Sequence, residues 1–478
     1  MGGLRAALSR ILPAVVTVAG VAAVLRVVYD PWFLNYDARY SLLWARDVWQ
    51  GHKPDYTADF APTPHPLQTA VSSLALPFGE ASDQVVTWMI LLCFGALVLL
   101  TYRLGAALFS PWVGAVAALV VLTRPALERD AALAYQDVPF AALVVGAVLL
   151  EARRPRRGMP VLALLALAGL LRPEAWVLAG AYALYASRGL GARRRAAMLA
   201  LAAAAPVLWA LTDWIVTGDL LHSLHGTSAL AEAVDRRRDI EDVPYWTAQY
   251  FGFALREPLV VGVPIGLAFA WFHARRRSVL PLAVVVAMTA VFAVGPLFGL
   301  PLIRRYVSTP SVLLTLFYGL AVCGWMLLPR GSAARRGWLA AGVLAAALSV
   351  VYLPWHYDML AGIERRVEAD GRLYADLKLA AEAPAVRAAF DACAPLTSGD
   401  RRPIPFARWW IDGPPHSVST VTGGASPMGR MLLMPRRGPT TRRIYGPRTF
   451  PKVAIPPGQE LIYRNASWEV YAEPACRR

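Results

Sequence analysis

The stretch NYDARYSLLWARDVWQGHKPDYTADFAPTPHPL, residues 35–67, is the first long polar segment of the chain. It contains an acid (Asp37), several aromatic residues, a glycine turn at Gly51 and a Pro-His-Pro sequence near its end. The chain as a whole is different, with 57% hydrophobic and 17% charged residues and a mean hydropathy of +0.44. That composition is typical of a polytopic membrane protein and excludes an ordinary soluble domain. We therefore interpret the rest of the chain as a membrane scaffold that holds residues 35–67 at one face of a bilayer.

The net charge of +16 could indicate a nucleic-acid partner, but the placement of the basic residues argues against one. They lie in short clusters between apolar runs, which is the pattern of cytoplasmic loops in membrane proteins. We expect no nucleic-acid partner. Almost all of the basic residues are arginines, and the only lysines are Lys53, Lys378 and Lys452. This bias suggests a GC-rich genome, and the overall composition suggests an actinobacterial source.

A membrane-spanning helix needs about 20 predominantly apolar residues. The hydropathy pattern predicts eleven spans, at about 8–28, 84–102, 111–126, 137–151, 159–171, 173–187, 196–216, 258–273, 279–298, 306–328 and 337–354. Only Arg172-Pro173-Glu174 separates the fifth span from the sixth, so residues 159–187 form either two helices meeting at a tight turn or a single broken helix. The first span is expected to remain uncleaved, because no small-residue cleavage site precedes the aromatic segment.

The arginine clusters decide between these alternatives. With the amino terminus inside, eleven spans place every short arginine-rich loop on the cytoplasmic side. Counting 159–187 as one span would place the last two clusters outside. The opposite face then receives most of the acids and the long polar segments. We predict a transmembrane domain at 1–356, with an extracytoplasmic catalytic loop at 29–83 and a membrane-lying lid at 217–257, and an extracytoplasmic domain at 357–478.

The last third of the chain has a soluble composition. Residues 361–392 look helical, and strand-like pieces follow at 430–434, 460–464 and 467–472, which predicts a small α/β domain. Cys393 and Cys476 lie in this region, and an extracytoplasmic location would favour a disulfide between them over two unpaired thiols. Cys93 and Cys323 fall within apolar runs and are expected to be buried small hydrophobes.

None of the common soluble-enzyme motifs is present: no P-loop, no dinucleotide fingerprint, no HExxH and no GxSxG. His222 and His225 are three residues apart and could share a helix face, but no nearby carboxylate or cysteine completes a metal site. A structural role is the preferred reading for this pair.

Charged groups at membrane depth are costly and therefore informative. Several lie at the predicted outer level of the membrane. They are Asp37 after the first span, Asp137 at the start of the fourth, Arg172 and Glu174 in the turn, Asp213 near the end of the seventh, and Arg304 and Arg305 before the tenth. Any one of them alone would be an interfacial cap or a local ion pair. Together they predict a single outward-facing cavity.

Sugar transfer from a polyprenyl phosphate fits acids and arginines at this level. A carboxylate within hydrogen-bond reach can accept the proton of the acceptor hydroxyl. Guanidinium groups bind the departing lipid phosphate and stabilise its developing charge. Nucleotide sugars are absent outside the cell, so an outward-facing enzyme needs a membrane-borne donor.

The motifs resemble those of GT-C glycosyltransferases, especially the protein O-mannosyltransferase and aminoarabinose transferase group. The matching pieces are Asp37-Ala38-Arg39-Tyr40, Ala45-Arg46, Gly51, Pro64-His65-Pro66-Leu67, Asp137-Val138-Pro139, Leu171-Arg172-Pro173-Glu174, and Arg305-Tyr306 followed by Pro310. They cover roughly the first 310 residues, and eleven spans suit this group. The chain departs from the pattern at Ala38, where the group often has a second acid. It also departs at His65, which either replaces a proline or stands where a basic residue binds phosphate.

The resemblance implies roles for individual residues. Asp37 would be the catalytic base, and Asp137 a second acid near the acceptor or a metal. Arg305, Arg172, His65 and Arg304 would face the donor phosphate, and Tyr40, Glu174, Tyr306 and Asp130 would bind substrate. The departures leave metal dependence open, so no cofactor is assigned, and a divalent cation (Mg or Mn) is the alternative.

The resulting prediction is an α-helical polytopic GT-C-like membrane protein that transfers arabinofuranose or mannose from a polyprenyl-phosphate donor with inversion. Its acceptor would be a glycan, a glycolipid or a protein. One rival is a polyprenyl-lipid or glycan transporter (a flippase), which predicts internal repeats and a path to both faces, neither of which the sequence shows. A second rival is a non-catalytic envelope-assembly partner, in which Asp37 would be replaceable.

Overall fold

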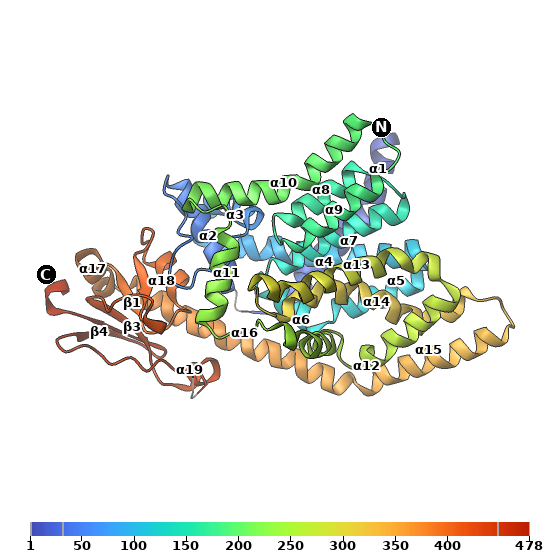
Figure 1. Ribbon diagram of the computed structural model, residues 1–478. Coiled ribbons are helices and arrows are strands. Elements are labelled where there is room, and N and C mark those ends of the chain that lie inside the picture. The colour runs from blue at the N-terminus through green and yellow to red at the C-terminus, as the bar shows by residue number, and fades with distance from the viewer. Residues whose placement is uncertain (1, 31–32, 447–448, 478) are drawn as a thin grey trace.

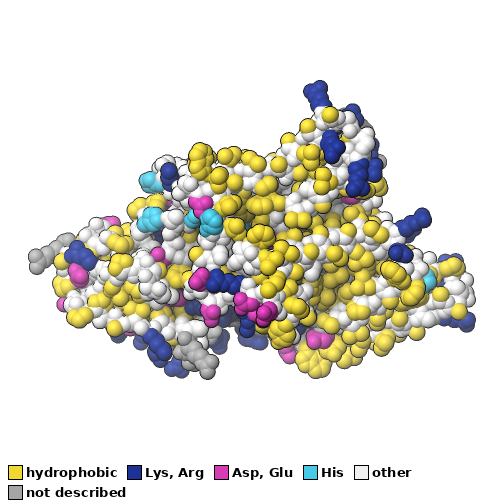
Figure 2. Space-filling view, viewed as in Figure 1, with side chains coloured by type: hydrophobic (Ala, Val, Ile, Leu, Met, Phe, Trp, Pro, Cys, Tyr) yellow, Lys and Arg dark blue, Asp and Glu magenta, His cyan; other side chains and the backbone are white. Residues whose placement is uncertain are grey.

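The computed structural model describes residues 2–30, 33–446 and 449–477. It is mainly helical. Long helices form one body that contains the amino terminus, and a small mixed α/β unit lies at the opposite end with the carboxyl terminus (Figure 1). In the space-filling view, hydrophobic side chains cover the helical body, and several Lys and Arg side chains project from the end farthest from the α/β unit (Figure 2). This distribution is that of a membrane protein with a soluble appendage.

Eleven helices overlap the eleven predicted spans. They are α1 (Gly2–Val28), α4 (Ser82–Leu108), α5 (Pro111–Leu122), α7 (Asp137–Arg153), α8 (Met159–Gly169), α9 (Glu174–Ala186), α10 (Ala192–Thr217), α12 (Val243–His273), α13 (Arg275–Val294), α14 (Ser308–Cys323) and α15 (Ala333–Val351). Among the described residues, seven helical stretches are long and apolar enough to cross a membrane. The number is eight if α5 and the bent continuation α6 (Pro125–Ala132) form one span. The chain is thus a polytopic helical membrane protein.

Residues 159–187 form two helices. The indole N–H of Trp176 in α9 donates to the carbonyl of Gly169 at the end of α8 (2.8 Å), which closes the turn between them. At 1.5 Å per residue, α8 and α9 are only about 16 and 20 Å long, shorter than a bilayer core of about 30 Å. The tight turn agrees with the two-helix alternative that the arginine clusters favoured.

Small residues allow the helices to approach closely. A Cβ atom added to Gly266 of α12 would lie 1.7 Å from the carbonyl oxygen of Phe317 in α14. One added to Gly105 of α4 would lie 2.6 Å from Cα of Gly114 in α5. Lipid is as apolar as the helices, so their association depends on such close van der Waals packing. The first of these contacts packs α12 against α14, and almost all residues of α14 are buried.

The segment 29–83 is mostly helical rather than an open loop. It contains α2 (Tyr36–Trp49), α3 (Pro66–Ser72) and the 3₁₀ helix η1 (Ser73–Ala81). The side chain of Asn35 caps α2 by accepting from the backbone N–H groups of Asp37 (2.8 Å) and Ala38 (3.0 Å). Its amide also donates to the carbonyl of Leu133 (2.6 Å). The first turn of α2, with Asp37, is therefore fixed to the membrane domain.

The carboxyl-terminal unit follows α16 (Leu353–Glu382), a helix that runs without interruption through the predicted boundary at 356 and 357. It contains α17 (Pro384–Cys393), α18 (Ile404–Trp410), α19 (Pro439–Ile444) and a five-stranded sheet of order β2-β1-β3-β5-β4. The strands are β1 (Leu396–Ser398), β2 (Val418–Thr420), β3 (Met431–Pro435), β4 (Glu460–Arg464) and β5 (Trp468–Ala472). β1 is parallel to β2 and β3, and β5 is antiparallel to β3 and β4. The predicted small α/β domain is confirmed.

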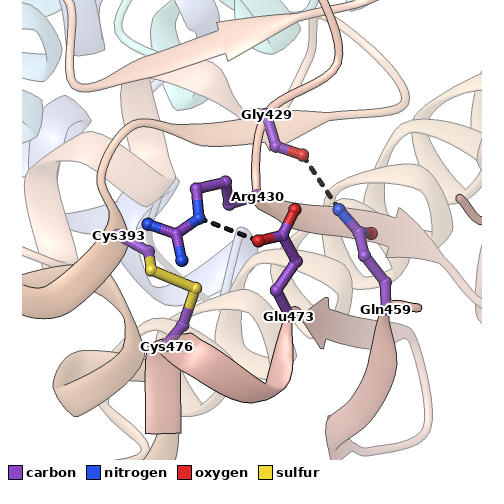
Figure 3. Close-up of a disulfide and its surroundings, with 6 residues drawn as sticks. All are labelled: Cys393, Gly429, Arg430, Gln459, Glu473 and Cys476. Atoms are coloured by element: carbon purple, nitrogen blue, oxygen red, sulfur yellow. Dashed lines mark hydrogen bonds and ion pairs between the residues drawn. A yellow bond between two sulfur atoms is a disulfide. The ribbon is translucent and has the colours of Figure 1, made fainter. Parts of the chain in front are cut away.

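A disulfide joins Cys393 at the end of α17 to Cys476 in η7 (Pro474–Arg477), as shown in Figure 3. Beside it, Arg430 donates to Glu473 (2.8 Å) and the amide of Gln459 donates to the carbonyl of Gly429 (2.9 Å). The prediction of this pair is confirmed. Cys323 is buried and Cys93 is half-buried, both as free thiols.

Three acids of the segment 35–67 bind the carboxyl-terminal unit. Asp47 forms an ion pair with Arg408, and both side chains are buried. The carboxylate of Asp55 accepts from the N–H of His416 (2.8 Å), and that of Asp59 accepts from the N–H of Thr420 (2.9 Å). These three acids hold the two parts of the chain together. Asp37 is the remaining acid of the segment and is therefore its candidate for a catalytic role.

Candidate active site

A cavity of about 570 Å³ lies between the start of α3, the α8–α9 turn, α10, α11 (His222–Ala233) and the segment before α14. Aromatic and aliphatic side chains form most of its wall, including Trp176, Trp209, Phe292, Phe298 and Leu224. Its polar lining includes His65, Gln136, Arg172, Glu174, Asp213, Arg305 and Tyr306. The sequence analysis had placed five of these residues in the site: His65, Arg172, Glu174, Arg305 and Tyr306. The fold brings these five residues together although more than 240 positions of the sequence separate the first from the last.

Asp37 and Arg305 form the first charged pair of the site. Nη1 of Arg305, in the 3₁₀ helix η4 (Arg304–Val307), donates to Oδ2 of Asp37 in α2 (2.7 Å). The side chains are 14% and 23% exposed, so the carboxylate is neither sealed off nor in bulk solvent. Burial alone would raise the pKa of Asp37, but the charge of Arg305 and its hydrogen bond to the carboxylate lower it overall. Asp37 is therefore a carboxylate at neutral pH.

Arg172 forms the second charged group, with two acids. Its Nη1 donates to Asp137 in the first turn of α7, and its Nη2 lies 2.8 Å from Oε1 of Glu174. The guanidinium also lies over the ring of Tyr306, 4.4 Å from the centroid. All three charged side chains are at most 10% exposed. Asp137 does not line the cavity and holds Arg172 from behind, whereas Arg172 itself is part of the lining.

His65 is a neutral member of the site. It precedes α3, its Nε2 lies 2.8 Å from the amide nitrogen of Gln136, and its ring meets that of Trp209 edge to face at 5.8 Å. Burial, together with Arg305 and Arg172, lowers the pKa of His65 to about 3. The imidazole is therefore uncharged at physiological pH and can accept from the Gln136 amide.

Five residues that the resemblance placed in the site are not part of the cavity lining. Asp37 and Asp137 are bonded to arginines of the lining, and the other three have other partners. Tyr40 is fully buried and packs against the indole of Trp44, with the ring centroids 5.3 Å apart. Asp130 is paired with Arg129 (2.5 Å). Arg304 turns away, and its guanidinium lies 3.7 Å from the centroid of the Phe253 ring in α12.

The sequence analysis did not identify several residues of the site. Trp176 and Trp209 lay within apolar spans and were not distinguished from core residues. Asp213 was included among the charged groups predicted to share one cavity, and it does line the cavity, but it was given no role. Its carboxylate accepts from the N–H (2.8 Å) and the hydroxyl (2.9 Å) of Ser223, and thereby fixes α11 against the cavity. This places the first part of the predicted lid segment 217–257, residues 220–227, in the cavity wall.

The two acids that could hold a divalent cation are both engaged by arginines. Asp37 forms an ion pair with Arg305, and Asp137 forms one with Arg172. Across the described ranges, no group of three or more His, Cys, Asp or Glu side chains is arranged to hold a metal ion. His222 and His225 have separate partners, the carbonyl of Tyr56 (3.3 Å) and Asp219 (2.7 Å).

The fold is that of known membrane proteins. ArnT from Cupriavidus metallidurans bound to undecaprenyl phosphate is similar over 98% of both chains, with a TM-score of 0.57 and 14% identity. The apo state of the same protein gives a TM-score of 0.53 and 13% identity over 98% of this chain and 99% of that one. The Archaeoglobus fulgidus oligosaccharyltransferase in the apo form gives 0.50 and 12%, over 85% of this chain and 64% of that one.

The chain has a GT-C fold. No protein-family model matches it, and no curated protein sequence matches it. Identities of 12–14% establish the fold and nothing finer. The chemistry of this GT-C protein has to come from the residues of its own cavity.

Proposed function

We propose that this GT-C protein transfers a glycosyl group from a polyprenyl-phosphate donor to an acceptor hydroxyl at the extracytoplasmic membrane surface. One observation carries the proposal. A single cavity combines apolar walls with two guanidinium groups, and one of these, Arg305, binds the ionised carboxylate of Asp37, which is itself outside the lining. The apolar walls suit an isoprenoid tail, the guanidinium groups suit a phosphate, and the carboxylate suits a hydroxyl that loses its proton.

The donor would lie with its phosphate at Arg172 and Arg305. Both guanidiniums line the cavity, and each is held by a carboxylate that fixes its direction. Planar guanidinium groups bind phosphate oxygens in pairs, and their charge stabilises a leaving phosphate as it forms. The isoprenoid tail would follow the apolar wall of Trp176, Trp209 and Phe298 toward the membrane. The fold neighbour ArnT has a structure with undecaprenyl phosphate, a carrier of this class.

Asp37 would act on the acceptor. As the acceptor oxygen forms its bond to the anomeric carbon, the bond from that carbon to the phosphate oxygen breaks, and polyprenyl phosphate leaves with the electron pair. The hydroxyl proton passes to the carboxylate of Asp37 late in this step, when the attacking oxygen has become acidic. A single displacement of this kind inverts the anomeric configuration.

His65 would contribute without charge. Because its imidazole is neutral, the positive charge that faces the phosphate comes from the two arginines. His65 and Gln136 would keep this part of the wall polar and fixed in position. Because Arg172 and Arg305 can stabilise the charge of the leaving phosphate, we propose that transfer needs no divalent cation.

The arginine-rich loops lie at the cytoplasmic side in this proposal, by the positive-inside rule. The cavity and the carboxyl-terminal unit would then be outside, where the Cys393–Cys476 disulfide persists. We keep mannose and arabinofuranose as the proposed sugar classes, and a glycan, a glycolipid or a protein as the acceptor.

The test uses the purified full chain in nanodiscs with radiolabelled polyprenyl-phosphate mannose and polyprenyl-phosphate arabinofuranose. Formation of a labelled glycoside is expected with one of them, and it should disappear in Asp37→Asn. Arg305→Ala should weaken donor binding more than acceptor binding, whereas Arg365→Ala, an exposed arginine of α16, should change neither. Movement of the labelled lipid between leaflets without a new glycosidic bond would instead identify a transporter and overturn the proposal.

A further inference from the structure

A second cavity, of about 550 Å³, lies in the membrane domain among α3, α4, α7 and α8. It is a groove along two helices. Its lining residues recur at helical spacing from Val86 to Arg103 on α4 and from Pro139 to Arg153 on α7. At 1.5 Å per residue, the two rows are about 26 and 21 Å long, against about 30 Å for the hydrocarbon core of a bilayer. The groove therefore runs through most of the thickness of the membrane.

The walls of this groove are almost entirely apolar. They include the small residues Ala96 on α4 and Ala142 and Gly146 on α7. A Cβ atom added to Gly146 would lie 3.5 Å from Leu164 and 3.7 Å from Leu100, so a larger side chain has room to begin there. A lipid chain gains no hydrophobic free energy in such a groove, because the surrounding lipid is equally apolar. The walls can hold a chain, but they cannot select one lipid over another.

Two arginines line one end of the groove. Arg103 lies in the last two turns of α4, and Arg153 is the last residue of α7. Because α5 returns the chain between them, α4 and α7 run in the same direction. The first residue of α7, Asp137, is bonded to Arg172 of the catalytic site. The two arginines therefore lie at the end of the groove that is farther from the catalytic cavity.

Neither guanidinium has an acidic partner. Within the described ranges, Arg103 and Arg153 form no ion pair within 4.0 Å and no side-chain hydrogen bond. Glu151, the acid nearest to Arg153 in the sequence, accepts instead from the backbone N–H of Arg156 (2.8 Å) and from the hydroxyl of Tyr182 (2.6 Å). The apolar groove thus ends at two cations that an anion could neutralise.

We propose that the groove binds one anionic phospholipid of the cytoplasmic leaflet, with its phosphate at Arg103 and Arg153 and one acyl chain along α4 and α7. In the orientation proposed above, the arginines face the cytoplasmic surface, where anionic lipids give the leaflet its negative potential. Guanidinium groups bind phosphate oxygens by charge-assisted hydrogen bonds, so they supply the selectivity that the walls lack. The chain spans about half of the 30 Å core and so passes Gly146, about 10 Å along α7 from Arg153.

The binding test uses the full chain, purified in detergent and freed of lipid, with bound lipid counted by native mass spectrometry. The probes are palmitoyl-oleoyl phosphatidylglycerol and palmitoyl-oleoyl phosphatidylcholine, and the first should bind in preference. Arg103→Gln and Arg153→Gln should each weaken binding of phosphatidylglycerol by about fivefold, the effect of one arginine on an anionic lipid. Arg154→Gln is the matched control and should change nothing, because Arg154 is exposed and does not line the groove.

Gly146→Leu tests the groove itself. The new side chain would fill the path of the acyl chain and leave both arginines in place, so binding of phosphatidylglycerol should be lost. Thermal unfolding of the lipid-free variant shows whether it is folded. Phosphatidylglycerol should also raise the melting temperature of the wild-type chain more than phosphatidylcholine does, because a lipid that binds only the folded state stabilises it. If Gly146→Leu does not fold, the arginine variants alone decide the question.

Three results would overturn the inference. Equal affinity for the two probes, or equal losses in Arg153→Gln and Arg154→Gln, would show only a general attraction between basic loops and anionic lipid. Unchanged binding of phosphatidylglycerol in folded Gly146→Leu would place the lipid outside the groove. Tighter binding of undecaprenyl phosphate than of phosphatidylglycerol would assign the groove to a polyprenyl chain. None of these measurements uses sugar transfer, so the inference holds or fails independently of the proposed function.

Discussion

Replacing Asp37 by asparagine tests the central chemical claim with almost no change in shape. The amide keeps the size of the side chain and can still lie beside Arg305, but it cannot accept a proton at neutral pH. General-base catalysis contributes about 10²–10⁴ in rate. At about 1.4 kcal/mol per factor of ten, the variant should raise the activation free energy by about 2.7–5.5 kcal/mol. The loss should appear in kcat, with donor binding largely retained.

The ion pair complicates this substitution, because asparagine leaves Arg305 without a counter-charge. The side chain of Arg305 is only 23% exposed, so water screens its charge poorly. A fall in activity could then reflect misfolding. Asp83→Asn is the matched control. Asp83 is bonded to Arg39 (2.7 Å), its side chain is 19% exposed, and it lies outside the cavity. Both variants lose one carboxylate from a partly buried Asp–Arg pair, and only one of them loses the proposed base.

The assay follows initial rates of transfer in nanodiscs, alongside thermal unfolding of each variant. We expect Asp83→Asn to retain activity within about threefold when folded, and Asp37→Asn to lose at least 10². If Asp37→Asn transfers sugar at the wild-type rate, Asp37 is not the base. Equal losses in the two folded variants would also contradict the reasoning, because the effect would then belong to the ion pair and not to proton transfer.

The remaining predictions concern pH, the disulfide and the contact between the two parts of the chain. His65 is held neutral with a pKa of about 3, so kcat/KM should show no acidic limb near pH 6.5. In the unfolded chain His65 takes up a proton near pH 6.5, so the free energy of unfolding should fall as the pH drops from about 6.5 toward 3. An acidic limb of kcat/KM at pH 6.5 would refute the conclusion that His65 is held neutral. Reducing Cys393–Cys476, or replacing both by serine, opens a loop of 83 residues and should cost about 4.5 kcal/mol in the chain-entropy model, measurable by denaturant unfolding. Asp47→Ala leaves the buried Arg408 with only its longer ion pair to Asp55 (3.9 Å), and it should lower the free energy of unfolding by up to about 3–5 kcal/mol. Proteolysis of the carboxyl-terminal unit should become faster, and an unchanged cleavage rate would show that the Asp47–Arg408 pair does not hold that unit in place.

Much of the scaffold could be predicted from local patterns. Apolar runs, arginine clusters and strand-like alternation depend on neighbouring residues, so they predicted the overlap with eleven helices and three of the five strands. β1 and β2 were missed because each has only three residues, too few for a period to show. The helical nature of 29–83 was missed because its cap and anchor depend on Asn35 meeting Leu133, a contact across 98 residues.

The sequence by itself determined that this chain is a helical membrane protein, because the cost of burying charge in lipid is a property of each residue alone. On the same ground it predicted that Asp37, Arg172 and Arg305 lie at one level of the bilayer. Only the tertiary structure decided which of these charges meet. It paired Asp37 with Arg305, set Asp137 behind Arg172, and turned Tyr40 and Arg304 away from the cavity. These pairings depend on how helices far apart in the sequence pack against one another, and a hydropathy pattern does not predict that packing.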